Sequence, residues 1–153
     1  MKRDPILKQS LIVFVGVLIL YTCAFKGIEY FRTVKGPWEV TFRSDSNGLP
    51  SLVISQASIG LTNMTVTFDG EAIDRINLSE TMRFDSPKTN IPFGGVLFFD
   101  TTVLPGTLTF HLFGHEIEFL PRVMIANLNE VAWKSGETVR FNASNKPPSS
   151  PAP

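Results

Sequence analysis

An uninterrupted apolar segment at residues 11–20, LIVFVGVLIL, constrains this chain more than any other feature. It has no charged or amide side chain. The apolar residues that flank it extend it to about 20 residues, which is roughly 30 Å as an α-helix and matches the hydrocarbon core of a bilayer. A helix that is apolar on every side has no polar face to present to water. The sequence therefore predicts a single N-terminal transmembrane helix.

This segment divides the N-terminal part of the chain into three pieces. We expect a short tail at residues 1–8, the transmembrane helix at residues 9–25 and a juxtamembrane linker at residues 26–36. The helix can continue into the linker and should end at Gly36, because a residue that precedes proline avoids the helical region of φ/ψ space. The side chains expected to contact lipid are Leu11, Ile12, Val13, Phe14, Val15, Val17, Leu18, Ile19 and Leu20.

Three interpretations of the apolar segment are open. An uncleaved signal-anchor needs only length and apolarity, and we favour it. A cleaved signal peptide would use the basic start of the chain, the apolar run and a processing site at Thr22-Cys23-Ala24. A lipoprotein would carry lipid on Cys23, although Tyr21 and Thr22 are bulkier than the small residues usual before such a cysteine. Cys23 is the only cysteine, so no disulfide can form within the chain.

The charged residues that flank the segment bear on its orientation. Three basic residues precede it and three follow it closely: Lys2, Arg3 and Lys8, then Lys26, Arg32 and Lys35. Glu29 offsets part of the second group, and a free amino terminus adds to the first. Because positive charge is retained on the cytoplasmic side, we expect the N-terminus inside. The rest of the chain would then be extracytoplasmic, either periplasmic or extracellular.

From Trp38 onward the period of the apolar residues changes to two, which is typical of strands with one buried face. Trp38, Val40 and Phe42 fall on one face, and polar residues separate them. The 13 Phe residues suit such strands. Residues 37–142 are therefore predicted to form an all-β domain, an antiparallel β-sandwich with a small β-barrel as the alternative. The Pro- and Ser-rich residues 143–153 are expected to be disordered.

The clearest predicted hairpin turns at Gly114-His115, where glycine suits the first central position of a type II′ turn. This register places His111 opposite Glu118 on the solvent face, while the other face is wholly apolar. The residues of the apolar face pair as Leu112 with Ile117, Phe110 with Phe119, and Leu108 with Pro121.

Two further hairpins follow from turn signals. A type I′ turn at residues 69–70, Asp-Gly, is predicted to join strands at residues 64–68 and 71–75. A three-residue loop at residues 134–136, with glycine in the left-handed conformation, is predicted to fold residues 131–141 into a closing hairpin.

Few residues are candidates for chemistry. The chain has no nucleophile elbow and no phosphate-binding glycine loop, and we predict no catalytic residue, metal ligand or cofactor. His111 and His115 would lie about 13 Å apart on one strand, too far to share an ion. The remaining polar cluster is His111, Glu116, Glu118 and Asp100. We expect a cross-strand pair of His111 with Glu118, worth about 0.2–1 kcal/mol. Asp100, within an apolar strand predicted at residues 96–103, should mark a strand end or bulge.

Charge and composition limit the function that the sequence supports. The formal net charge is zero and no basic stripe occurs, so we expect no nucleic-acid partner. We favour a membrane-anchored, non-catalytic binding or assembly module, with membrane lipid and a protein as its partners. One alternative is a small-ligand or lipid-binding barrel. Another is a hydrolase or metalloenzyme that uses His111 and nearby carboxylates, so the sequence leaves enzymatic activity undecided.

Overall fold

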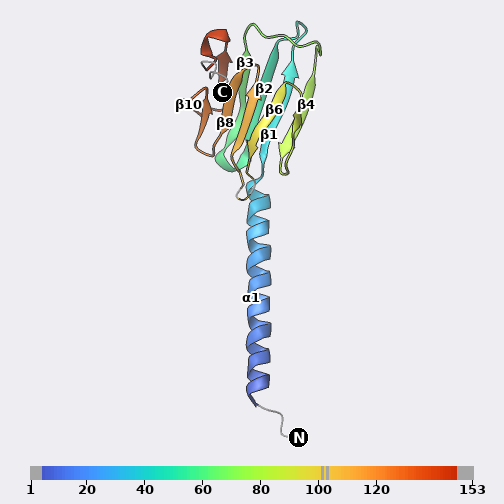
Figure 1. The fold of residues 1–153 in the computed structure, drawn as a ribbon, viewed down its shortest axis with the longest axis vertical. Coiled ribbons are helices and arrows are strands. Elements are labelled where there is room, and N and C mark those ends of the chain that lie inside the picture. Colours follow the sequence, from blue (N-terminus) through green and yellow to red (C-terminus); the bar gives the residue numbers. More distant parts are fainter. Residues whose placement is uncertain (1–4, 101, 103, 148–153) are drawn as a thin grey trace, which may run out of the picture. The chain divides into compact units, whose positions relative to one another are not determined.

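The computed structural model describes residues 5–100, 102 and 104–147, and the chain divides into two units, residues 1–34 and 35–153. Helix α1 (Pro5–Lys35) makes up the described part of the first unit (Figure 1). The described part of the second unit contains β1 (Trp38–Ser44), β2 (Pro50–Gln56), η1 (Ala57–Ile59), β3 (Leu61–Phe68), β4 (Ser79–Phe84), β5 (Asn90–Ile91), β6 (Gly94–Phe99), β7 (Leu108–Leu112), β8 (His115–Phe119), β9 (Val123–Ala126), β10 (Asn129–Ala132), β11 (Thr138–Phe141) and η2 (Ala143–Asn145).

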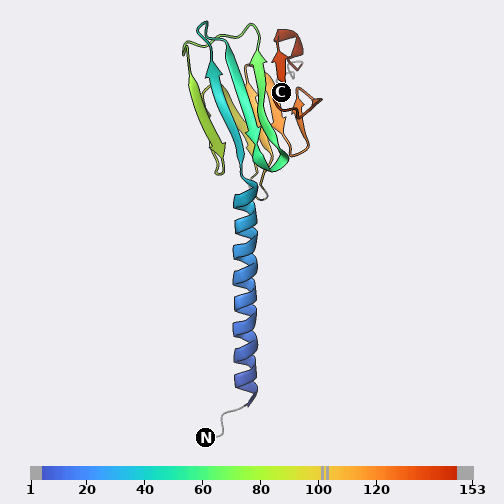
Figure 2. The same ribbon diagram turned by 180° about the vertical axis from the view of Figure 1, so that it is seen from behind.

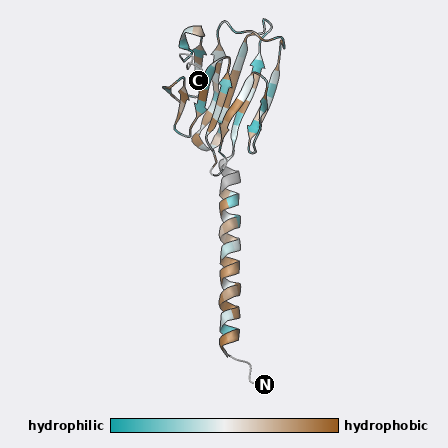
Figure 3. Cartoon of the chain, viewed as in Figure 1, coloured by the Kyte–Doolittle hydropathy of each residue, from teal (hydrophilic) through white to brown (hydrophobic). Residues whose placement is uncertain are grey.

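Helix α1 confirms the predicted apolar helix. It begins at Pro5, whose fixed φ is compatible with the first turn of a helix. The segment Ile6–Phe31 is 26 residues long and apolar enough to cross a membrane, and none of its most apolar stretch is buried inside the chain (Figure 3). Gly36, which follows the helix, has φ +71°, the left-handed conformation that commonly ends helices. The helix is longer than residues 9–25 because it continues through nearly all of the predicted linker.

The second unit is a β-sandwich, as predicted. Sheet A has the strand order β11-β3-β2-β1-β4, and sheet B has the order β10-β9-β8-β7-β6-β5. Figure 2 shows the strands of sheet A in front of those of sheet B. All of the pairings are antiparallel except that of β11 with β3. Because the two sheets do not join into a closed cylinder, the alternative prediction of a small barrel is wrong.

Side chains from the inner faces of the two sheets form one aromatic core. Trp38, which was predicted to begin a strand and to be buried, contacts Phe119 of the opposite sheet with ring centroids 5.4 Å apart. Phe110 meets Phe119 edge to face at 5.2 Å and Phe84 at 5.3 Å. Such edge-to-face pairs contribute beyond their buried area. The period-two pattern of each strand supplies these inward-facing residues.

The hairpin of β7 and β8 differs from its predicted register by two positions. Phe113 and Gly114 are the turn residues, with φ of +53° and +81°, so the turn is of the type I′ class rather than type II′. Leu112 therefore pairs with His115, where the prediction paired it with Ile117. A shift of two residues preserves the faces of a strand. The predicted apolar residues therefore do share one face, but that face is not wholly apolar, because it also contains the buried His115, and Pro121 lies beyond the end of β8.

The predicted hairpin around residues 69–70 is wrong. Residues 71–75 form no strand, and β3 pairs instead with β2 and β11. The segment returns past the turn between β1 and β2, where the N–H of Ile73 donates to the carbonyl of Gly48 at 3.0 Å. A Cβ at position 48 would lie 2.6 Å from the carbonyl oxygen of Ile73, so this approach requires glycine. The local turn signal could not reveal this tertiary contact.

The predicted closing hairpin over residues 131–141 is also wrong. Val131 lies on β10 in sheet B, whereas Val139 and Phe141 lie on β11 in sheet A. The loop at residues 134–136 therefore crosses from one sheet to the other. Parallel pairing of β11 with β3 joins residues about seventy positions apart, such as Val139 and Val66, and no local pattern in the sequence indicates such a pairing.

Ordered structure continues past residue 142, where the sequence predicted disorder. Asn142 caps helix η2 by accepting a hydrogen bond from the N–H of Ser144 at 2.9 Å, and the Asn145 side chain accepts from the N–H of Asn142. Lys146 then forms an ion pair with Glu71 at 2.8 Å. Residues 148–153 lie outside the described part of the chain, so the prediction for them stays a prediction.

The core assignment predicts a large difference between two phenylalanines of β6 and β7. Phe110 is fully buried, so Phe110→Ala should lower the free energy of unfolding by about 3–5 kcal/mol. Phe98 is 55% exposed, so Phe98→Ala should change it by about 0.5 kcal/mol or less. Urea unfolding of the full chain in detergent micelles, followed by tryptophan fluorescence, measures both. Losses of equal size would contradict the assignment of faces.

Candidate functional site

The predicted polar cluster lies in part on the outer face of sheet B. His111 of β7 pairs with Glu116 of β8, while Glu118 pairs with Thr109. The predicted partner of His111 was Glu118, and the two-residue change of register explains the difference. His111 and Glu116 are exposed and Glu118 is half-buried. The structure therefore brings the histidine and the two carboxylates onto one face, where any role in binding or catalysis stays a prediction.

Asp100 does not join this cluster. It follows the last residue of β6, in agreement with the predicted strand end, and its carboxylate accepts a hydrogen bond from the N–H of Thr102 at 2.8 Å. The hydrogen bonds from Thr102 lower the pKa of Asp100. Gly95 is the residue of β6 that pairs with His111, so Asp100 lies five positions farther along, about 16 Å at 3.3 Å per residue. Its carboxylate has a local role in the turn.

Within residues 5–100, 102 and 104–147, no group of three or more His, Cys, Asp or Glu side chains is close enough to hold an ion.

The burial of His115 was not predicted, because the turn signal at Gly114-His115 placed this residue in a turn. The ring of His115 is fully buried on the inner face of β8 and stacks on Phe141 with centroids 5.3 Å apart. Its Nδ1 lies 2.8 Å from Nδ2 of Asn127. Counting back by two from the inward-facing Ile117 would have placed position 115 on the buried face. The expectation of a turn overrode that signal.

The contacts of Asn127 determine the tautomer of His115. The amide oxygen of Asn127 accepts from the N–H of Glu116 at 3.0 Å, and Nδ2 donates to the carbonyl of Asn145 at 2.6 Å. Nδ2 therefore faces His115 as a donor, and Nδ1 of the imidazole must accept. The proton of the neutral ring is on Nε2, which is buried and has no hydrogen-bond partner among the described residues. Burial lowers the pKa of His115, and the charge of Lys146 lowers it further.

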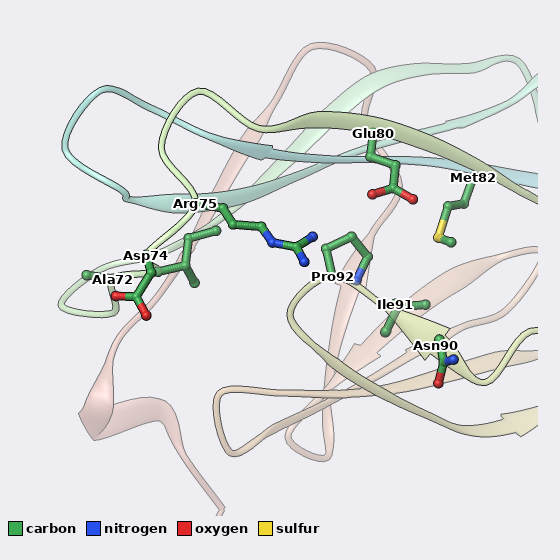
Figure 4. A pocket seen from close by; sticks show the side chains of 9 residues that line it. Ala72, Asp74, Arg75, Glu80, Met82, Asn90, Ile91 and Pro92 are labelled. Atoms are coloured by element: carbon green, nitrogen blue, oxygen red, sulfur yellow. The ribbon is translucent and has the colours of Figure 1, made fainter.

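A cleft opens at the edge of the sandwich, between β4 of sheet A and β5 of sheet B. Its volume is about 620 Å³, and its apolar wall includes Met82, Ile91 and Pro92. Figure 4 shows the side chains of Glu80 and Met82 directed from β4 toward Ile91 and Pro92, with Arg75 extending into the cleft from the preceding loop. The cleft therefore combines apolar surface with one basic side chain, Arg75, and two acidic ones, Asp74 and Glu80.

The loop that carries Arg75 is held by Ser44 at the end of β1. The hydroxyl of Ser44 donates to the backbone carbonyl of Arg75 and accepts from the N–H of Leu78 at 2.9 Å. Among the described residues, the side chains of Arg75 and Glu80 form no ion pair and no hydrogen bond. Both charges are thus free to contact a ligand, and the apolar wall favours one with apolar groups. The predicted cluster contained none of these residues, because only the fold brings them together.

The chain was compared with protein families, curated proteins and solved structures. No protein family matches the chain, and neither a curated protein nor a solved structure matches it significantly.

The observed register predicts which carboxylate couples to His111. A double-mutant cycle of His111→Ala with Glu116→Ala should give a coupling energy of about 0.2–1 kcal/mol, as for other cross-strand pairs. The matched cycle with Glu118→Ala should give a coupling close to zero, because Glu118 pairs with Thr109. Urea unfolding of the four proteins in each cycle provides the values. Stronger coupling to Glu118 would support the predicted register instead.

The buried imidazole predicts that stability depends on pH. Folding lowers the pKa of His115 from its ordinary value of 6.5, so below that pH the unfolded chain binds the proton more readily. Stability should be complete above about pH 6.5 and should fall as the pH decreases, by at most about 1.4 kcal/mol per pH unit for one proton. His115→Gln should remove this dependence between pH 5 and 7, and His111→Gln should retain it. Parallel slopes for the two variants would assign the effect to other groups.

Proposed function

We propose that the chain is a membrane-anchored, non-catalytic binding module, with α1 as an uncleaved signal-anchor and the sandwich on the extracytoplasmic side. The observation that carries the anchor is the exposed apolar surface of α1. Side chains such as Leu11, Phe14 and Leu20 are each more than 60% exposed. At about 25 cal/mol per Å², exposing this much apolar surface to water is strongly unfavourable, and lipid would cover it.

The length of the helix supports a span rather than a surface attachment. The 26 residues of Ile6–Phe31 extend about 39 Å at 1.5 Å per residue, and a bilayer core is about 30 Å thick. The excess allows a tilted helix or places its ends in the interface. Tyr30 and Phe31 at the C-terminal end are residue types that suit the interface.

The sandwich supports a role in binding. Its inner faces pack aromatic and aliphatic side chains into one core, which argues against the open apolar cup that a lipid-binding barrel would need. The cleft between β4 and β5 is instead open at an edge of the fold. It is lined by the charged side chains of Asp74, Arg75 and Glu80, which form no ion pair among the described residues. An exposed site with unused charges suits a ligand that reaches the domain from outside.

Cysteine labelling tests the anchor and the side of the membrane. In a Cys23→Ser background, Leu128→Cys places a thiol on a side chain that is 87% exposed, and Lys2→Cys places one before the helix. A membrane-impermeant maleimide should label Leu128→Cys in cells whose outer membrane or cell wall has been permeabilised while the membrane that holds α1 stays intact. It should label Lys2→Cys only after detergent has dissolved that membrane. Both variants should remain in the membrane pellet after carbonate extraction.

Each other outcome overturns a specific part of the proposal. Labelling of Lys2→Cys but not Leu128→Cys in intact cells would place the domain in the cytoplasm. A mature protein that lacks the Lys2→Cys thiol, even in detergent, would indicate a cleaved signal peptide. An intact mass of the unsubstituted chain that shows cleavage and a lipid on Cys23 would indicate a lipoprotein. Release of both variants by carbonate would overturn the anchor itself.

A further inference from the structure

Strand β4 is an edge strand of sheet A. It pairs with β1 on one side, and no strand of the described chain pairs with its other side. The hydrogen bonds with β1 determine which backbone groups of β4 are used. The N–H of Ser44 donates to the carbonyl of Leu78 at 3.0 Å, and the register places these two residues directly opposite each other. This is therefore a hydrogen-bonded pair of the antiparallel ladder.

Hydrogen-bonded and non-hydrogen-bonded pairs alternate along such a ladder. Counting from the pair of Ser44 and Leu78, the residues Glu80, Met82 and Phe84 direct their N–H and C=O groups toward β1. An independent contact agrees with this count. The hydroxyls of Thr41 and Thr81 lie 2.9 Å apart, as expected of a non-hydrogen-bonded pair, in which opposite side chains come closer.

The remaining residues of β4 direct their backbone groups outward. Ser79, Thr81 and Arg83 each present an N–H and a C=O at the free edge, two residues or about 6.6 Å apart. A strand that lies antiparallel to β4 would form hydrogen bonds with all three. Edge pairing of this kind is a general way in which a sheet binds an extended peptide.

The cleft beside the edge would receive the side chains of an added strand. Glu80 and Met82 share the inner face with the core residues Phe42 and Val40, to which they are paired. A side chain of the added strand next to Met82 would therefore enter apolar surroundings, and one next to Glu80 would meet a carboxylate.

Glu80 restricts which strand can bind. A charge that points inward on an edge strand opposes pairing with an ordinary apolar strand, because the charge would be buried without a partner. Arg75 lies in the same cleft and forms no ion pair with Glu80. A basic side chain on the incoming strand would compensate the carboxylate, so Glu80 favours a strand that carries lysine or arginine at this position.

We propose that the free edge of β4 binds an extended segment of a protein partner, which adds antiparallel to sheet A and places a basic side chain against Glu80 and an apolar one against Met82. This inference rests on the proposed binding function and names the surface and the partner class. Backbone pairing supplies affinity, and the two inward side chains supply specificity.

A synthetic probe tests the proposal on the full chain in detergent micelles. The acetylated, amidated and fluorescently labelled peptide TVTVTKT matches the antiparallel register, with its lysine against Glu80, its second valine against Met82 and its third threonine opposite Thr81. Fluorescence anisotropy should show saturable binding. The matched peptide TVTVTET should bind more weakly by about tenfold or more.

Two chemical changes test the pairing without altering the protein. N-methylation of the threonine opposite Thr81 removes a hydrogen bond to β4 and should weaken binding by about tenfold. N-methylation of the second valine, whose N–H points away from β4, should leave binding unchanged. Equal losses on methylation, or equal binding of TVTVTKT and TVTVTET, would overturn the proposal.

Substitutions in the protein give the complementary test. Glu80→Lys should reverse the preference in favour of TVTVTET, whereas Glu130→Lys, at an exposed position of β10 in sheet B, should retain the preference for TVTVTKT. A second copy of this chain is the competing occupant of the edge. If analytical ultracentrifugation showed a dimer of the unsubstituted chain that Thr81→Pro converts to monomer, the partner at the β4 edge would be a second copy of this chain. That result would overturn the proposal that a different protein binds there. Peptide binding is measured in micelles and does not depend on the side of the membrane. Absence of binding would therefore overturn only the proposal for the β4 edge, whereas the labelling experiment tests the membrane anchor separately.

Discussion

Burial of aromatic side chains between two sheets is the interaction on which the rest of the β domain depends. Trp38 and Phe119 meet across the sandwich at 5.4 Å, and Phe110 lies fully buried beside them. Because side chains alternate faces along a strand, moving any strand by one residue would expose its share of this core. The core therefore fixes the face of each strand, and with it the positions that remain for the outer surface and for the edges.

The two sides of the sandwich differ in the contacts that their edges make. Near helix η2, Lys146 forms an ion pair with Glu71 at 2.8 Å, and Asn127 donates to the carbonyl of Asn145 at 2.6 Å. The chain following β11 therefore contacts the loops that follow β3 of sheet A and β9 of sheet B. On the side of β4, by contrast, the outward groups of Thr81 have no neighbouring strand, and the cleft remains open. The proposed binding function arises from this asymmetry. An unpaired edge strand next to an open cleft can add a partner strand.

Predictions that depended on side-chain period succeeded, whereas those that depended on a particular turn often failed. The hairpin of β7 and β8 has the predicted buried face although its register moved by two residues, because an even shift preserves the faces. The same shift moved His115 from a turn into the core and changed the partner of His111 from Glu118 to Glu116. The turn at residues 69–70 gave no hairpin, since β3 obtained its partners from distant parts of the chain.

The amino-acid sequence by itself determined the apolar helix, the all-β class of the domain and the inward faces of most strands. Each of these follows from hydrophobic periodicity, which is a local property. Only the tertiary structure decided the sandwich over the barrel, the parallel pairing of β11 with β3, the burial of His115, and the meeting of Arg75 with Glu80 at the cleft. These features depend on which strands become neighbours, and that choice is made by the packing of the whole core.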